Sequence, residues 1–160
     1  MTVNYELLDR QLDALIGDET DLLAASANFV GLLFAEITGI NWLGLYVLRG
    51  DELVLGPFQG LPACVRIPVG QGVCGTAAAE NRTIRVDDVH QFPGHIACDP
   101  VSKSEVVVPL VANGSVFAVL DVDSPDEARF SEEDESGIEM LCQRFVRHLL
   151  SIKADLRNFI

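Results

Sequence analysis

Residues 105–122, EVVVPLVANGSVFAVLDV, decide the fold of this chain. Two strongly apolar segments, residues 105–111 and 115–122, flank the dipeptide Asn113-Gly114. Asn-Gly between two such segments favours the tight turn of a β-hairpin. The stretch therefore predicts two adjacent antiparallel strands.

Helical periodicity marks both ends of the chain. It predicts two helices within residues 1–38, of which Gly17 ends the first and Asp18 caps the second. A C-terminal helix is predicted over residues 131–155, with Ser131 as its cap. Four acids follow this cap, where the helix dipole favours negative charge.

Between these helices, apolar residues recur at the spacing typical of β-strands. Besides the hairpin, the sequence predicts strands at 41–48, 52–58, 63–69 and 83–86, a short helix at 75–81 and a long loop at 87–103. This order indicates an α+β fold: a single domain, residues 1–160, with a mostly antiparallel sheet of about six strands and the terminal helices packed on one face. The short helix and the loop are left to cover a pocket on the other face.

Composition and charge restrict the partners. The chain has 160 residues, a mean hydropathy of +0.27 and a net charge of −13 at pH 7, typical of a compact acidic protein. Binding to nucleic acid or to an anionic membrane surface needs clustered Lys and Arg, so neither partner is expected. The acidic N-terminal segment lacks the basic region of a signal peptide, and a cytoplasmic location is the expectation.

Residues 70–75, GQGVCG, match the G-x-G-x-x-G pattern of dinucleotide-binding loops. Such a loop opens a long crossover helix that returns to a parallel sheet, whereas the helix expected here is only about two turns long. The glycines are therefore interpreted as a tight turn from strand to helix. Cys74 lies in this turn, near a helix N-terminus, where a thiolate is stabilised.

Four cysteines are present, at positions 64, 74, 98 and 142. In a chain with its own large core, thiols serve catalysis, redox chemistry or metal binding more often than they form structural disulfides. Cys98 lies in the long loop, whereas Cys142 lies on the apolar stripe of the last helix and is expected to be a buried small hydrophobe. The sequence has no C-x-x-C pair and no histidine pair at ligand spacing, so no metal site is expected. Burial of every thiol as an inert core residue is the alternative.

Three acids accompany the hairpin. Glu105 begins its first strand, and Asp121 and Asp123 lie on one face at the end of the second, because side chains alternate along a strand. The hairpin brings these ends together, and the three carboxylates repel one another. This repulsion raises their pKa values and keeps a proton available near neutral pH. A solvated strand end is the alternative, which the apolar context disfavours.

Together these residues resemble the GAF-domain family, and within it the free methionine-(R)-sulfoxide reductases. The similarity covers nearly the whole chain and is strongest over residues 41–48, 56–110 and 119–134. The spacing of the first three cysteines carries it, with the glutamate seven residues after the third and the Asp-Val-Asp sequence.

The resemblance implies an enzyme that reduces free L-methionine-(R)-sulfoxide with its own thiols and without a cofactor. It implies that Cys98 is the nucleophile that becomes a sulfenic acid, and that Cys64 resolves it by closing an intramolecular disulfide. Cys74 would be an auxiliary thiol. Spacing alone leaves either Cys64 or Cys74 as the principal resolving thiol.

The resemblance also implies the substrate contacts. Glu105 would act on the sulfoxide oxygen, and Asp121 and Asp123 would hold the ammonium group and support protonation. Trp42 and Tyr46 would form the apolar wall for the S-methyl group. These roles fit the chemistry, because a sulfoxide sulfur is a poor electrophile until its oxygen is protonated.

By the same resemblance, thioredoxin is the reductant, the enzyme acts in oxidative stress, and the N-terminal helices could support a homodimer. The alternative is a GAF-type redox or small-molecule sensor without turnover. Some GAF domains bind cyclic nucleotides, but their N-K-x-D type pattern is absent here. A redox sensor would use Cys64 and Cys98 without reducing a substrate, and a purely structural domain would tolerate Cys98→Ser.

Overall fold

The computed structural model describes residues 2–160, in which six strands form one antiparallel sheet in the order β3-β2-β1-β6-β5-β4. The strands are β1 Trp42–Arg49, β2 Glu52–Gln59, β3 Arg66–Pro68, β4 Ile84–Val86, β5 Ser104–Ala112 and β6 Ser115–Ser124. Asn113 and Gly114 both have positive φ, as the tight turn between β5 and β6 requires. The predicted antiparallel sheet and its central hairpin are confirmed.

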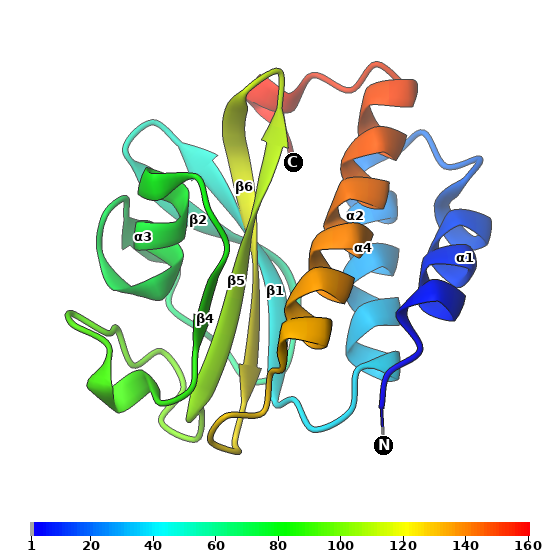
Figure 1. Cartoon of the computed structure of the whole chain (residues 1–160). Coiled ribbons are helices and arrows are strands. Elements are labelled where there is room, and N and C mark those ends of the chain that lie inside the picture. The colour runs from blue at the N-terminus through cyan, green and yellow to red at the C-terminus, as the bar shows by residue number, and fades with distance from the viewer. Residues whose placement is uncertain (1) are drawn as a thin grey trace.

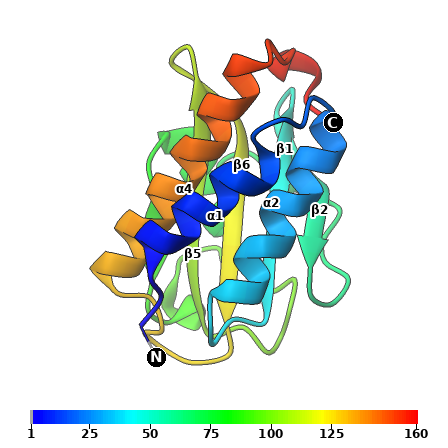
Figure 2. The same ribbon diagram turned by 90° about the vertical axis from the view of Figure 1, so that its right-hand side faces the viewer.

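Helices cover both faces of this sheet. Helices α2 (Leu22–Glu36) and α4 (Glu132–Ser151) pack on one face, and α1 (Tyr5–Ile16) packs across the outer side of both (Figures 1 and 2). Helix α3 (Gly72–Glu80) and the long loop lie on the opposite face (Figure 1). The expected α+β arrangement is therefore confirmed. None of the described helices is both long enough and apolar enough to cross a bilayer.

Two helix boundaries differ from the sequence-based expectation. Asp21, and not Asp18, caps α2: its carboxylate accepts a hydrogen bond from the Ala24 N–H at 2.8 Å, because the helix begins only at Leu22. Helix α4 ends at Ser151 and not at residue 155, and Lys153 then has a positive φ that the helix cannot continue through. Its predicted cap is confirmed, since Ser131 forms a capping box with Asp134.

The glycine-rich segment is tighter than predicted. Helix α3 begins at Gly72, three residues before the expected start, and the predicted strand at 63–69 pairs only over residues 66–68. Gly72 has a φ of +65°, and a Cβ on Gly75 would lie 2.5 Å from the Pro68 carbonyl oxygen. The glycines therefore serve the turn and a close approach of backbone to backbone, as expected.

Two apolar cores hold the layers together. The larger lies between the sheet and the three terminal helices and contains Cys142, which is 2% exposed as predicted. The smaller lies between the sheet and α3 and contains Trp42, Tyr46 and Cys74. The smaller core forms one wall of the pocket described next.

Candidate active site

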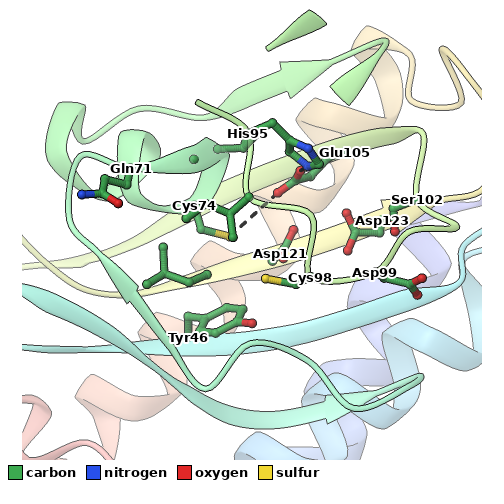
Figure 3. Close-up of a pocket in the computed structure, with 14 residues that line it drawn as sticks. Tyr46, Gln71, Cys74, His95, Cys98, Asp99, Ser102, Glu105, Asp121 and Asp123 are labelled. Atoms are coloured by element: carbon green, nitrogen blue, oxygen red, sulfur yellow. Dashed lines mark hydrogen bonds and ion pairs between the residues drawn. The ribbon is translucent and has the colours of Figure 1, made fainter. Parts of the chain in front are cut away.

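A pocket lies on the α3 face of the sheet, where such a pocket was expected (Figure 3). Strands β1, β5 and β6 supply its floor, and α3 and the long loop supply its walls. Its cavity volume is about 30 Å³, which holds roughly one water molecule. The pocket is thus nearly closed in this structure.

The hairpin register brings the three predicted carboxylates together. Glu105 pairs with Asp123 across β5 and β6, and Asp121 faces Val107 one pleat further along. Glu105 and Asp121 are 5% and 7% exposed, and among the described residues no Lys or Arg lines the pocket. The geometry predicted from a two-residue period is therefore correct.

Burial and mutual repulsion shift the acidity of these groups. Burial raises the pKa of Glu105 well above its usual value, and the charges of Asp121 and Asp123 raise it further. Burial also raises the pKa of Asp121 to about 6 and, with the Asp121 charge, raises that of Asp123. These raised pKa values favour the protonated forms, in the direction expected.

Cys74 is the third residue of α3 and faces the same acids (Figure 3). Its thiol donates a hydrogen bond to the Glu105 carboxylate at 3.9 Å. Burial, followed by the charges of Asp121 and Glu105, raises its pKa well above the usual value. The expectation of a stabilised thiolate is wrong, because burial and acidic neighbours outweigh the helix dipole.

Cys64 and Cys98 are joined by a disulfide, with their Cα atoms 5.3 Å apart. Cys98 lies in the long loop as predicted, whereas Cys64 precedes β3 and does not lie on a strand. Strand β1 anchors the Cys64 segment, since the Tyr46 hydroxyl donates to the Cys64 carbonyl at 2.8 Å. Cys74 stays a free, buried thiol.

The two predicted aromatic residues lie at different depths. Tyr46 lines the pocket, and Trp42 stacks against it with ring centroids 5.9 Å apart. Trp42 also stacks on Phe58, and its indole N–H donates to the Leu61 carbonyl at 3.0 Å. The structure therefore places Tyr46 in the wall and Trp42 behind it.

His95 is a pocket residue that the sequence analysis did not assign to the site (Figure 3). Its Nε2 lies 3.8 Å from Glu105 Oε2, and burial lowers its pKa. The one sequence signal was its place in the long loop, three residues before Cys98. The path of that loop, which periodicity does not predict, brings His95 to the acids.

The cluster is suited to hold a cation. Asp121 Oδ1 is buried and has no hydrogen-bond partner among residues 2–160. Ligand atoms of Cys74, Glu105 and Asp121 lie within 4.8 Å of one another, so these residues could hold a metal ion. An organic ammonium group fits the same carboxylates, because it offers several N–H donors to unpaired oxygens.

Comparison with known proteins assigns the fold to a family. The sequence pattern of the GAF domain matches residues 17–149. This chain belongs to the GAF-domain family. The chain is 55% identical to the free methionine-R-sulfoxide reductase of Escherichia coli (strain K12), over 97% of this chain and 93% of that protein.

Solved structures agree with this assignment. The GAF domain matches fRMsr of Staphylococcus aureus in complex with substrate, with a TM-score of 0.89 and 48% identity over 93% of this chain and 97% of that one. It also matches free methionine-R-sulfoxide reductase from Neisseria meningitidis in complex with its substrate, with the same TM-score of 0.89 and 41% identity, over 93% of this chain and 90% of that one.

Proposed function

We propose that this GAF domain reduces free L-methionine-(R)-sulfoxide to L-methionine through an intramolecular disulfide. One observation carries the proposal: the Cys64–Cys98 disulfide borders a pocket whose floor holds the carboxyl groups of Glu105, Asp121 and Asp123, the first two of them buried. The names of the relatives at 41% and 55% identity support the substrate and the stereochemistry.

The first step transfers oxygen from substrate to enzyme. With the disulfide reduced, the Cys98 sulfur attacks the sulfoxide sulfur while a carboxylic acid protonates the oxygen. The oxygen then passes to the Cys98 sulfur: the S–O bond of the sulfoxide breaks, the substrate gains two electrons and leaves as methionine, and Cys98, oxidised by two electrons, holds the oxygen as a sulfenic acid. Glu105 is the proposed proton donor because burial raises its pKa and so favours its protonated form. Asp123, its cross-strand partner, supports this protonation.

The second step resolves the sulfenic acid. The Cys64 thiol attacks the Cys98 sulfur, the disulfide forms, and the hydroxyl leaves as water. The observed disulfide supports Cys64 as the principal resolving thiol. Cys74 is left as an auxiliary thiol, since it is buried and donates to Glu105.

The pocket explains why the substrate would be a free amino acid. Asp121 and Asp123 are proposed to hold the ammonium group, which a methionine inside a peptide lacks. The carboxylate would meet the first turn of α3, which lines the pocket and has no side-chain cap. Tyr46, backed by Trp42, would contact the S-methyl group.

The cavity requires movement before substrate binds. A volume of about 30 Å³ leaves no room for methionine sulfoxide while the disulfide is closed. Reduction frees Cys98 and the loop that carries it, and we expect this loop to open the pocket. The disulfide form would then release methionine, and binding of the next sulfoxide would follow reduction.

The proposal also includes the reductant, the cellular compartment and the oligomeric state. Thioredoxin, in the cytoplasm, is the proposed donor of the two electrons that reopen the disulfide. Leu7, Leu15 and Leu23 lie exposed on α1 and α2, at 45%, 45% and 59%, and offer an apolar surface for a homodimer.

The deciding experiment measures methionine released from each epimer of free methionine sulfoxide, with dithiothreitol as reductant. We expect turnover of the R epimer alone, its loss in Cys98→Ser, and a fall of roughly 10²-fold or more in Glu105→Gln. No turnover of either epimer, with reduced and accessible thiols, would instead favour a redox sensor that uses the same disulfide.

A further inference from the structure

The surface around the disulfide is apolar. Leu61, Val65 and Val101 are 61%, 59% and 50% exposed, which places them among the most exposed large apolar side chains of the protein. The disulfide ties the two segments that carry them together. We use the term apolar collar for the exposed residues of these segments, Leu61, Pro62, Val65, Ala97, Pro100 and Val101.

The apolar collar is also an uncharged area on a strongly anionic chain. The net charge is −13, yet residues 61–65, LPACV, contain no charged side chain. Asp99 is the one acid in residues 96–101, and it is turned inward: Asn41 Nδ2 donates to its Oδ2 at 2.9 Å, and the Val101 N–H donates to its Oδ1. Close approach of another protein is therefore not opposed by charge here.

The reaction requires a partner that contacts this surface. Resting on the proposed function, each turnover leaves a disulfide that only an outside thiol can reopen, and the attacking sulfur must reach bonding distance of Cys64 or Cys98. Both cysteines are half-buried within the apolar collar, so a protein that delivers a thiol must contact the collar side chains. We propose that the apolar collar is the docking site of a protein dithiol reductant.

The thiol–disulfide exchange with the partner takes two steps. A thiolate of the partner attacks Cys64, a mixed disulfide forms, and the Cys98 sulfur leaves with the electron pair of the broken bond. The second thiol of the partner then displaces Cys64, so the partner ends as a disulfide and this protein as a dithiol. Cys64 is the sulfur attacked, because Cys98 and not Cys64 lines the pocket, where Glu105, whose raised pKa favours its protonated form, can supply a proton to the leaving sulfur.

The size of the apolar collar fits a transient partner. The apolar collar has only six side chains, all small or medium in size, which suits the small interface of a weak redox encounter and not that of a permanent dimer. A reductant must also leave after each exchange, so a small apolar contact around the sulfurs suits its task.

The test compares a protein reductant with a small one on the same disulfide. The protein is oxidised with diamide, mixed with reduced thioredoxin or with dithiothreitol, quenched in acid, and its free thiols are alkylated and counted by mass. The variant Leu61→Ser/Val101→Ser changes one side chain on each side of the disulfide. The matched control Leu150→Ser changes an exposed leucine on α4, outside the apolar collar and outside the proposed dimer surface.

We expect the collar variant to be reduced by thioredoxin about tenfold more slowly, a typical loss for two contact side chains, and by dithiothreitol within about twofold of the wild-type rate. The control should match the wild type with both. Thioredoxin that lacks its second active-site thiol should trap a mixed disulfide on Cys64.

Four results would overturn the proposal. They are an unchanged thioredoxin rate, an equal loss with both reductants, a trapped link to Cys98 alone, and conversion of a dimer to a monomer by the collar variant. The last result would make the apolar collar an interface between copies of this chain. The assay contains no sulfoxide, so failure of the proposed enzyme activity would be seen separately, in the methionine assay.

Discussion

Replacing Asp121 with Asn should remove a loss of stability that the wild type undergoes between pH 5 and pH 8, and should make the protein a poorer enzyme. Asp121 is 7% exposed, and its Oδ1 has no hydrogen-bond partner among the described residues. Its pKa rises from 3.8 to about 6 on folding. The native state therefore binds this proton more tightly than the unfolded state, and its contribution to stability is lost as the pH rises through about 6.

The size of the effect follows from the pKa. At about 1.4 kcal/mol per pH unit, a rise from 3.8 to about 6 costs roughly 3 kcal/mol of unfolding free energy once Asp121 is ionised. The linkage between proton binding and folding predicts that roughly 1.4 kcal/mol of this unfolding free energy is lost between pH 5 and pH 8. Asp121→Asn has no such loss, and it also removes a charge that raises the pKa of Glu105 and Asp123.

Urea unfolding of the oxidised protein at pH 5, 6, 7 and 8 tests this reasoning. The stability of Asp121→Asn relative to the wild type should grow by about 1.4 kcal/mol over this range. The matched control is Asp18→Asn, which removes an equal charge from an exposed position in the α1–α2 turn. Its stability relative to the wild type should change by less than about 0.5 kcal/mol. If the free energies of unfolding of the wild type and Asp121→Asn change in parallel with pH, the claim that Asp121 ionises without a compensating partner is refuted.

Two further predictions concern the thiols and the helical layer. When the reduced proteins react without added reductant, wild type and Cys64→Ser should each release about one methionine per chain. Only the variant should keep a sulfenic acid on Cys98, which the reagent dimedone labels. Dimedone labelling of the wild type alone would contradict this order of steps. A Cβ on Gly137 would overlap the Tyr5 ring, so Gly137→Ala should lose about 1–3 kcal/mol in urea unfolding. Gly31→Ala, with nothing within 4 Å, should instead be neutral or gain up to about 1 kcal/mol, and equal effects of the two substitutions would exclude packing as the cause.

Much of this protein is determined by signals that act within a few residues. Asn113-Gly114 predicts the hairpin, and the hairpin with a two-residue period predicts that Glu105, Asp121 and Asp123 meet. Turn chemistry and side-chain alternation depend on neighbours in the chain or across one turn. For this reason the sheet, the terminal helices and the acidic cluster are predictable without coordinates.

The tertiary structure alone decided which distant groups share the pocket and what their surroundings do to them. Cys64 and Cys98 are 34 residues apart, and the path of a loop without periodicity places Cys98 beside Cys64 and His95 beside Glu105. Cys74 has the sequence context of a reactive thiol, yet burial against acids raises its pKa. Desolvation and long-range charge depend on everything packed around a group, and a local sequence pattern does not contain that information.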